Sequence, residues 1–325
     1  MKFVVTGATG FVGSSIVKSL VNIGAEVYAL ARPSSSPERL ADLPLTWLIA
    51  DVTQASTMRG AFEGVDYVIH AAGMLGQAGT AEKEYMQLHV DGTRNVLNEL
   101  SQNDPQPKTL YVSSPGVLGP IDGPPADEET PLAPSNPYER SKAVAERMVG
   151  VFTAAGMPVV IARPEFIYGP GDTHVLGLFK AIQQERFLFI GDGLNMCHPT
   201  YIDDAVDGML RCLEQGKPGE VYHITGPRPV TFRELATTIA DVLDVPAPRF
   251  RVPRSLAMVG AASFEALSKV TRKDPPLSRT GVAFFSEDRS FSWDKAKREL
   301  HYEPQYDLRA GIEATINWYR QQGVL

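Results

Sequence analysis

Tyr138 and Lys142, four residues apart, are the pair of side chains in this sequence best suited to proton transfer. That spacing places both on one face of a helix, and Asn136 followed by Pro137 is typical of a helix start. A phenol with an ordinary pKa of about 10 is a poor base at neutral pH. A neighbouring positive charge favours the phenolate and lowers that pKa. Tyr138 could therefore exchange a proton with an alcohol; the alternative is an ordinary surface pair.

Ser114 is a second candidate, because it ends a strand-like run, TLYVSS (109–114), and ligands of open α/β sheets bind at such strand ends. Its hydroxyl could hold the oxygen atom that exchanges its proton with Tyr138, or it could simply cap the strand. The segment 115–137, with seven prolines and three glycines, connects the two residues. It must pass beside them, so we expect it to contact a substrate, with Pro115 at its start.

Glycines at positions 7, 10 and 13 follow the first strand-like run, KFVVTG (2–7), and accompany the start of a helical pattern from Phe11 to Ile23. At such a junction one glycine makes a tight turn, one lets the backbone approach a pyrophosphate, and one allows the helix to pack closely on the strand. The pyrophosphate would lie on free N–H groups at the helix start. An ordinary glycine-rich turn is the alternative, but the position at the first strand favours a dinucleotide site.

The second strand-like run, EVYALA (26–31), ends where many dinucleotide-binding proteins carry an acidic residue for the ribose. Here Arg32 follows, with hydroxyls at Ser34, Ser35 and Ser36, and this group suits a 2′-phosphate. NADP is therefore favoured over NAD, unless Arg32 is only a solvated loop residue. Asp51, which ends the third strand, could accept a hydrogen bond from the adenine amino group or cap the helix expected after it.

Strand-like and helix-like segments alternate through the first half of the chain. The strands are apolar at nearly every position, which indicates burial on both faces, and the alternation implies parallel crossovers. The sequence predicts an α/β fold: a doubly wound parallel Rossmann sheet with a smaller, mostly helical C-terminal substrate domain. Residues 1–168, with 198–226 returning to them, form the predicted dinucleotide-binding domain; 169–197 and 227–325 form the substrate-binding domain. The expected strands are 2–7, 26–31, 45–51, 66–72, 109–114, 158–164 and 220–226, and the expected helices include 11–23, 53–63, 82–103, 138–155, 198–216 and 231–243.

Composition narrows the classes of function. Of 325 residues 43% are hydrophobic, and 31 basic against 38 acidic residues give a net charge of −7. Such a chain is a poor candidate for nucleic-acid binding, which needs a basic surface. The two cysteines, Cys197 and Cys212, lack metal or disulfide spacing and suit a reducing cytoplasm. We expect a soluble cytoplasmic protein with no metal, no signal peptide and no membrane span.

Together these motifs resemble the extended short-chain dehydrogenase/reductase family, also called the NAD-dependent epimerase/dehydratase family. The resemblance implies that Ser114 polarises the substrate oxygen, that Tyr138 is the acid/base, and that Lys142 clamps the ribose and lowers the pKa of Tyr138. It also implies a homodimer. The stretches that carry it are TGATGFVG (6–13), Asp51-Val52, HAAG (70–73), SS (113–114), Tyr138-x-x-x-Lys142, RPEFIYGPG (163–171), HPTYIDDAVDG (198–208) and FSWDKAKRELHYEP (291–304). The implied cofactor-binding residues are Gly7, Thr9, Gly10, Phe11, Val12, Gly13, Arg32, Asp51, Val52, Ala71, Ala72, Gly73, Tyr138, Lys142, Pro164 and Ile167.

Departures from the family pattern reduce the range of expected substrates. Nucleotide-sugar members usually carry Asn where this chain has Phe166 and Arg where it has Cys197, and their later Arg-rich diphosphate motif is missing. In its place stands PPLSRTGVAFFSEDRSF (275–291), which is similar to the 3β-hydroxysteroid and sterol-4-carboxylate dehydrogenase branch. His89 stands where many relatives have Asn. The expected substrate contacts are Ser114, Pro115, Phe166 and Arg279.

Three functions fit these observations. The leading one is an NAD(P)-dependent oxidoreductase that interconverts a secondary alcohol and a ketone on a hydrophobic or steroid-like substrate, the nicotinamide carrying the hydride and Tyr138 the proton. The second is a nucleotide-sugar 4-epimerase or dehydratase with tightly held NAD, against which Phe166 and Cys197 count. The third is a non-catalytic NAD(P)-sensing protein, but the intact Ser114, Tyr138 and Lys142 argue against it.

Residues 249–273 combine six basic residues and one acid with an apolar run, LAMVGAASFEAL (256–267). The segment could make a peripheral contact with a membrane surface or form the wall of a lipophilic pocket. A core helix with a solvated face is the commoner structure, and it is the one we expect here.

Overall fold

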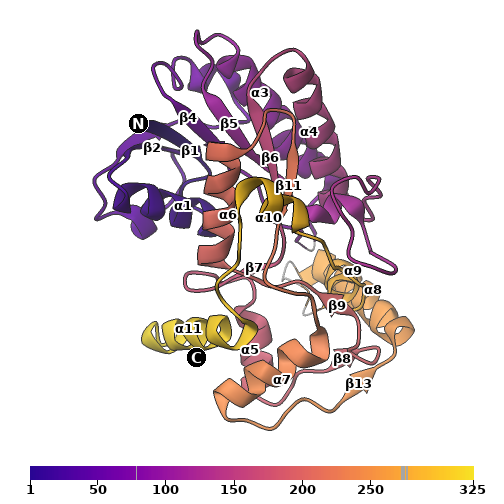
Figure 1. Cartoon of the computed structure of the whole chain (residues 1–325). Coiled ribbons are helices and arrows are strands. Elements are labelled where there is room, and N and C mark those ends of the chain that lie inside the picture. Colours follow the sequence, from indigo (N-terminus) through magenta and orange to yellow (C-terminus); the bar gives the residue numbers. More distant parts are fainter. Residues whose placement is uncertain (78, 272–274, 276) are drawn as a thin grey trace.

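The computed structural model describes residues 1–77, 79–271, 275 and 277–325, and a seven-stranded sheet lies at its centre (Figure 1). All neighbouring strands pair in parallel, in the order β11-β6-β5-β4-β1-β2-β3. The predicted Rossmann-like sheet is confirmed, including the late strand that returns to it. The strands are β1 (Lys2–Thr6), β2 (Glu26–Ala31), β3 (Thr46–Ile49), β4 (Tyr67–His70), β5 (Lys108–Val112), β6 (Val159–Pro164) and β11 (Val221–Ile224).

Alternate residues of the central strand β1 are buried against opposite faces of the sheet, as the two-residue period of a strand requires. Phe3 and Val5 belong to a core that includes α1 (Phe11–Asn22) and α6 (Ile202–Gln215). Val4 belongs to a second core, with α3 (Gly92–Leu100) and α4 (Pro137–Ala154). Helices therefore cover both faces, which is why the strand is apolar at successive positions.

Helix α4, which carries the predicted acid/base, begins where the sequence indicates. The Asn136 side chain accepts a hydrogen bond from the Glu139 N–H at 3.0 Å, and Pro137 occupies the first turn. The helix expected over 82–103 is also present, but as α2 (Glu82–Tyr85), a π-helical segment (86–91) and α3. Wide π turns are frequent at functional sites, and the one here holds His89.

The prediction of a helix over 53–63 is wrong, because only a short 3₁₀ turn, Ala55–Met58, forms there. The Thr57 hydroxyl donates to the carbonyl oxygens of Asp51 and Gln54, and such local bonds compete with a helix. Gly60 then adopts a φ of +71°, outside the right-handed helical region.

The second half of the chain adds a mostly helical part, drawn below the sheet in Figure 1. Its short strands pair as β7 with β10, β9 with β12 and β8 with β13. Helix α7 begins as predicted at Thr231, whose hydroxyl accepts a hydrogen bond from the Glu234 N–H at 3.0 Å. The remaining elements are β7 (Ile167–Tyr168), α5 (Leu176–Gln183), β8 (Phe189–Ile190), β9 (Met196–Cys197), β10 (Thr200–Tyr201), β12 (Val230–Thr231), α7 (Phe232–Leu243), β13 (Arg251–Val252), α8 (Arg254–Thr271), α9 (Arg279–Phe284), α10 (Asp294–Leu300) and α11 (Leu308–Gln321).

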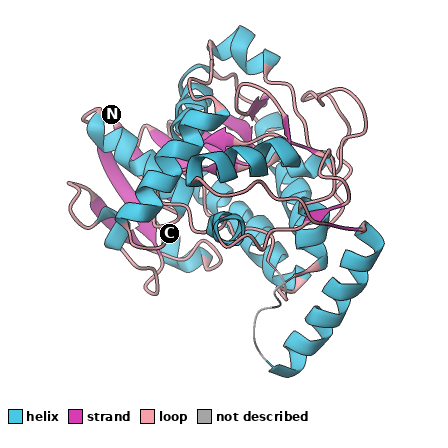
Figure 2. Cartoon of the chain, turned by 90° about the horizontal axis from the view of Figure 1, so that it is seen from below, coloured by secondary structure: helices cyan, strands magenta, loops and turns pink. Residues whose placement is uncertain are grey.

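Helix α8 differs from the core helix expected within 249–273. Ala257 and Ala261 are buried, whereas Leu256, Val259 and Leu267 are 60%, 65% and 57% exposed. The helix projects from the body of the molecule in Figure 2, so much of its outer side is apolar. Residues 272 and 273 of the segment lie outside the described residues. In the part of the chain that the structure describes, no helix is both long and apolar enough to cross a membrane.

A buried ion pair joins α4 to the sheet. The Glu146 carboxylate pairs with Arg163 of β6, and their side chains are 6% and 3% exposed. Glu146 also accepts a hydrogen bond from the Ser113 hydroxyl, just after β5, at 2.6 Å, and Arg163 donates to the His223 ring in β11 at 3.3 Å. Buried charges are stable only with such partners, so this contact fixes where α4 lies relative to three strands.

Replacing Glu146 by leucine should lower the free energy of unfolding by about 3–5 kcal/mol, because it leaves the Arg163 guanidinium buried without its carboxylate. Urea unfolding followed by circular dichroism measures the loss. The double variant with Arg163→Leu should recover much of it, and Glu313→Leu, which breaks the exposed pair with Arg309 on α11, should change little. A loss for Glu146→Leu no larger than for Glu313→Leu would contradict this account.

Candidate active site

The glycine-rich turn between β1 and α1 leaves room for a ligand at one of its three glycines. Gly7 has a φ of +69°, and a Cβ built there would lie 2.7 Å from the Ala71 carbonyl oxygen. A Cβ at Gly13 would lie 2.1 Å from the Gly7 carbonyl oxygen. Among the described residues, a Cβ at Gly10 would approach only that same oxygen, at 3.3 Å. Packing therefore requires Gly7 and Gly13, whereas Gly10 leaves the helix start open to a pyrophosphate.

The other predicted cofactor residues lie along the carboxyl ends of the strands. The Ala72 N–H donates to Thr6 Oγ1 at 3.2 Å, which holds the segment after β4 against β1. A Cβ on Gly73 would lie 3.3 Å from His89 Nε2 and 3.6 Å from Lys142 Nζ, so a side chain here would crowd the predicted ribose clamp. Thr9, Phe11 and Val12 belong to the turn and the start of α1, Val52 comes after β3, and Pro164 and Ile167 stand at the end of β6 and in β7. The residues present thus fit a dinucleotide.

Asp51 holds a turn rather than the helix that was expected after it. Its Oδ1 atom accepts hydrogen bonds from the Thr53 N–H at 2.9 Å and from the Thr53 hydroxyl at 2.8 Å. This is an Asx-type turn. Within the described part of the chain, Asp51 Oδ2 has no hydrogen-bond partner, and it is free to accept one from an adenine amino group.

A surface cavity of about 320 Å³ lies beside the cofactor turn. Arg32, which the sequence singled out, lines it together with Arg39, which the sequence analysis missed. Arg39 lies in a 3₁₀ turn after an irregular loop, where no periodicity predicts the fold. Its Nη1 donates to the Gly171 carbonyl oxygen at 2.7 Å. The other lining residues are Thr9, Ser34, Ser35, Ser36 and Glu38, so two guanidinium groups and several hydroxyls meet where a phosphate could be bound.

Ser114 and Tyr138 are brought together by the end of β5 and the first turn of α4. Burial raises the pKa of Tyr138 to about 12. The nearby Ser114 hydroxyl and the charge of Arg289 act on this pKa in the opposite direction, while Glu165 and Glu139 add to the rise. The phenol therefore carries its proton at neutral pH and can give it to a carbonyl oxygen.

Lys142 lies one helical turn after Tyr138 and faces the sheet. Its Nζ donates to the Val112 carbonyl oxygen, at the end of β5, at 2.9 Å, and burial lowers the pKa of Lys142 to about 8. The two roles expected of Lys142, lowering the pKa of Tyr138 and clamping the ribose, stay predictions.

His89, from the π-helical segment, packs edge-on against Tyr138 with ring centres 5.6 Å apart. Its Nε2 accepts a hydrogen bond from the Met74 N–H at 3.1 Å, so Nδ1 carries the ring proton and donates to the Ser141 hydroxyl at 2.8 Å. That hydroxyl donates to the Tyr138 carbonyl oxygen at 2.7 Å. Burial and the Lys142 charge lower the pKa of His89 to about 2. The neutral ring therefore supports the turn that holds the predicted acid/base.

The structure places aromatic and sulfur-containing side chains at positions 166 and 197, where the sequence led us to expect a departure from nucleotide-sugar enzymes. The ring centre of Phe166 lies 6.4 Å from that of Phe232 and 5.1 Å from that of Phe284. Cys197 is buried, and its thiol donates to the Val230 carbonyl oxygen at 3.5 Å. An aromatic cluster thus includes Phe166, and a buried thiol occupies position 197.

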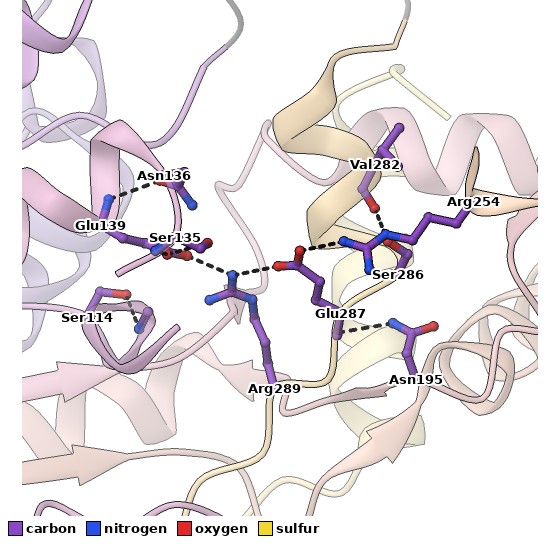
Figure 3. A network of polar contacts seen from close by, with 11 residues as sticks. Ser114, Ser135, Asn136, Glu139, Asn195, Arg254, Val282, Ser286, Glu287 and Arg289 are labelled. Carbon is purple, nitrogen blue, oxygen red and sulfur yellow. Dashed lines mark hydrogen bonds and ion pairs between the residues drawn. The ribbon is translucent and has the colours of Figure 1, made fainter. Parts of the chain in front are cut away.

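Arg279 and Arg289 differ sharply in their surroundings. Arg279, the expected substrate contact, is largely exposed and pairs with Glu265 of α8 at 2.8 Å. Arg289 is buried, and its Nη2 pairs with Glu139 at 2.7 Å (Figure 3). A Cβ on Gly116 would lie 3.4 Å from Arg289 Nη1, close to the Ser114 turn. Sequence analysis missed Arg289 because it chose Arg279 from the same stretch, 275–291, and nothing in the sequence alone distinguishes the two arginines.

Alanine at Gly10 and at Gly13 should separate cofactor binding from folding. Gly10→Ala should keep the melting temperature but weaken NAD(P)H binding by about tenfold or more, because the methyl group stands between the pyrophosphate and the helix N–H groups. Gly13→Ala should lower both, since its Cβ would overlap the Gly7 carbonyl oxygen at 2.1 Å. Thermal unfolding and cofactor fluorescence titration measure the two effects. Unchanged affinity in Gly10→Ala would remove the pyrophosphate from this turn.

Known proteins are similar to this chain in sequence and in fold. The sequence profile of the "NAD dependent epimerase/dehydratase family" matches residues 3–225. The "4-hydroxy-2-methyl-3-oxo-4-farnesyl-3,4-dihydroquinoline-1-oxide ketoreductase" of Stigmatella aurantiaca is 30% identical over 97% of this chain and 95% of its own. The "2-alkyl-3-oxoalkanoate reductase" of Stenotrophomonas maltophilia is 30% identical over 96% of this chain and 97% of its own.

The crystal structure of DesIV, a dTDP-glucose 4,6-dehydratase from Streptomyces venezuelae with NAD bound, has a TM-score of 0.82 to this chain at 26% identity, covering 99% of this chain and 97% of that one. The family profile spans more than half of the chain, and the relatives match it from end to end. The chain therefore belongs to the NAD-dependent epimerase/dehydratase family, as an NAD(P)-dependent oxidoreductase of the extended short-chain type.

Proposed function

We propose that this oxidoreductase interconverts a secondary alcohol and a ketone on a hydrophobic or steroid-like substrate. The observation that supports this most is the aromatic cluster of Phe166, Phe232 and Phe284. Phe166 comes two residues after the carboxyl end of β6, the edge of the sheet at which Ser114 follows β5, and ligands of open α/β sheets bind at such strand ends. An apolar cluster at that edge, together with one proton donor, selects a substrate that is mostly apolar and carries few oxygens.

The chain's own groups supply the proton and hold the oxygen. In reduction, the bound nicotinamide supplies a hydride to the carbonyl carbon. Ser114 donates a hydrogen bond to the carbonyl oxygen, and Tyr138 gives that oxygen its phenolic proton, so a neutral alcohol forms. Because the pKa of Tyr138 is about 12, the proton is in place before the reaction. Solvent returns a proton to the phenolate after the alcohol leaves, and oxidation uses the same atoms in reverse.

The two relatives reported above support a carbonyl substrate with a large apolar part. The name of one gives a 3-oxo compound that carries a farnesyl chain, and the name of the other gives a 2-alkyl-3-oxoalkanoate. The alternative of a nucleotide-sugar epimerase or dehydratase is favoured by the likeness to DesIV, but Phe166 and Cys197 leave it without the side chains that bind the sugar nucleotide. A non-catalytic NAD(P) sensor would not require Ser114 and Tyr138 to meet.

NADP is the cofactor we propose. The cavity that contains Arg32, Arg39 and several hydroxyls supports this choice, because a 2′-phosphate needs cations and hydroxyl donors together. A homodimer and a cytoplasmic location stay predictions of the family resemblance. The exposed apolar side of α8 supports the alternative considered for 249–273, a peripheral contact with a lipid surface.

Tyr138→Phe should reduce turnover at least about a thousandfold, because it removes the only proton that the mechanism transfers, while NADPH affinity should change less than about twofold. Ketone-dependent NADPH oxidation and fluorescence titration measure the two quantities. Val151→Ala, at an exposed position farther along α4, serves as the control. A variant that still reduces the ketone at the wild-type rate would show that another group is the acid.

Arg32→Ala should weaken NADPH binding by about 10- to 100-fold and NADH binding by much less, because only NADPH carries the 2′-phosphate. Arg39→Ala should act in the same direction. Titration of both cofactors into both variants measures the change, with Arg59→Ala as a control at an exposed arginine outside the cavity. Equal losses for NADH and NADPH would remove the reason for preferring NADP.

A further inference from the structure

The outer side of α8 is apolar and almost free of charge. At 100° per residue, its four large exposed side chains fall within less than half of the helix circumference. They are Leu256, Val259, Phe264 and Leu267. From 255 to 268 the sequence has one charged residue, Glu265, and it pairs with Arg279 at 2.8 Å. Single exposed apolar residues are ordinary, but several on one side of a projecting helix are typical of an interaction surface (Figure 2).

The strand before α8 extends this apolar surface. In the pairing of β13 with β8, Arg251 lies opposite Phe189, and the Phe189 N–H donates to the Phe250 carbonyl oxygen at 3.0 Å. Phe250 therefore lies beside Leu188, and the two side chains are 70% and 50% exposed. Both are apolar side chains of the kind that enter the boundary between lipid headgroups and acyl chains.

The charges next to the apolar side chains are basic. Between positions 245 and 264 the sequence has three arginines and no acidic residue. Arg249 and Arg251, on either side of Phe250, are exposed, and neither forms an ion pair with any residue that the structure describes. The third, Arg254, pairs with Glu287 at 2.7 Å. Exposed apolar side chains with unneutralised arginines beside them match the chemistry of an anionic lipid bilayer.

The inner side of α8 leads toward the aromatic cluster of the site. Ala257 and Ala261 are buried together with Val282 of α9, and Phe285 packs against this group. The ring centre of Phe285 lies 5.3 Å from that of Phe232, which belongs to the aromatic cluster described above. Apolar contacts thus continue from α8 through α9 to the surroundings of the predicted substrate.

Helix α9 also lies close to the predicted acid/base. A Cβ on Gly76 would lie 3.6 Å from Thr280 Cγ2 and 3.6 Å from Tyr138 Cβ. The segment after β4 is therefore in reach of both α9 and the first turn of α4. A surface that bound α8 from outside would lie next to the part of the molecule that contains Tyr138.

We propose that this region binds the surface of an anionic lipid bilayer. The α8 surface consists of the four exposed apolar side chains of α8 together with Leu188, Phe250, Arg249 and Arg251. The apolar side chains enter the headgroup boundary, and the two arginines contact lipid phosphates. Binding places α9 and the aromatic cluster next to the phase in which apolar molecules are concentrated, and only this consequence rests on the proposed function.

The charges favour a bilayer over a second copy of the chain. An interface between two copies related by a twofold axis must be self-complementary, because the same residues face each other. The α8 surface offers two arginines, whereas the one acid nearby, Glu265, is already paired with Arg279. A second copy would therefore bring no counter-charge from the same surface, and an anionic bilayer does.

Sedimentation with vesicles tests the apolar part of the α8 surface. The full-length protein is mixed, without cofactor or substrate, with large vesicles of phosphatidylcholine and phosphatidylglycerol at a ratio of about 3:1. Leu256→Ser/Val259→Ser should lower the binding constant about tenfold, because less apolar surface enters the lipid. The matched control is Ile23→Ser/Val151→Ser, which changes two equally exposed apolar residues elsewhere and should alter binding less than about twofold. Melting temperatures report whether each variant is folded.

The same measurement with a second pair of variants tests the charged part. Arg249→Gln/Arg251→Gln should lower binding to the mixed vesicles about 10- to 30-fold, since each basic side chain near an anionic surface contributes about fivefold. Binding to vesicles of phosphatidylcholine alone should be weaker for the wild type and almost unchanged by this substitution. Arg59→Gln/Arg320→Gln, at two exposed arginines outside the α8 surface, is the control.

A tryptophan reporter tests which face touches the lipid, and it does not depend on the serine variants. The emission that Val259→Trp adds to that of the three native tryptophans should be quenched by vesicles that contain brominated acyl chains. The emission added by the control Val151→Trp, on α4, should not be quenched.

Three results would overturn the α8 surface: no binding of the wild type to the mixed vesicles, losses in the control pairs as large as in the test pairs, or an unquenched Val259→Trp. Self-association of the wild type that Leu256→Ser/Val259→Ser abolishes, without vesicle binding, would assign α8 to a second copy instead. Ketone reduction by NADPH is measured separately. Vesicle binding without reduction removes the proposed function and leaves the α8 surface standing, and reduction without vesicle binding does the reverse.

Discussion

The buried ion pair between Glu146 and Arg163 is the contact on which the arrangement of the active site depends. Glu146 lies two turns after Tyr138 on α4, Arg163 comes two residues before Glu165, and the Ser113 hydroxyl that bonds Glu146 belongs to the residue before Ser114. The Glu146 carboxylate therefore helps to fix the positions of three elements: the helix of Tyr138, the segment of Ser114 and the strand that precedes Glu165. Because both charges are out of water, any rearrangement that separates them is strongly unfavourable. A small shift of α4 along the sheet would misplace the phenol relative to the serine hydroxyl, and this contact opposes it.

The protein also contains a cluster of buried or partly buried charged side chains and a cluster of aromatic side chains. Charged side chains, Glu139, Arg289, Glu287 and Arg254, form an alternating chain that cancels its own charge and ends beside Ser114 (Figure 3). Aromatic side chains from three other segments, Phe166 before β7, Phe232 in α7 and Phe284 in α9, form an apolar cluster. Burial is the largest cause of the high pKa of Tyr138.

Sequence alone predicted most of the sheet, because its strands are apolar throughout and are separated by clear turn and cap signals, such as Asn136 and Pro137 before α4. It also predicted the groups that lie near one another in the chain or at strand ends: the three glycines, Ser114 and the pair on α4. It failed where local bonds override a pattern, as at Thr57, where hydroxyl bonds replace the expected helix. It also missed Arg39, which lies in a 3₁₀ turn after an irregular loop, and Arg289. The arginine chosen from the C-terminal stretch, Arg279, lies in a paired helix, and only the three-dimensional path of the loop distinguishes it from Arg289.

The aromatic cluster comes largely from a different part of the chain than the proton-transfer groups. Ser114, Tyr138 and Lys142 are all anchored to the sheet by residues before position 170, whereas Phe232, Phe284 and Arg289 belong to the later half. Substitutions at Phe232 and Phe284 therefore leave Ser114, Tyr138 and Lys142 in place, whereas a change at Arg289 would also act on the Tyr138 phenol. Divergence within such a chain can proceed by altering one half at a time, and a laboratory library confined to those two aromatic positions would explore new substrates while keeping the reaction constant.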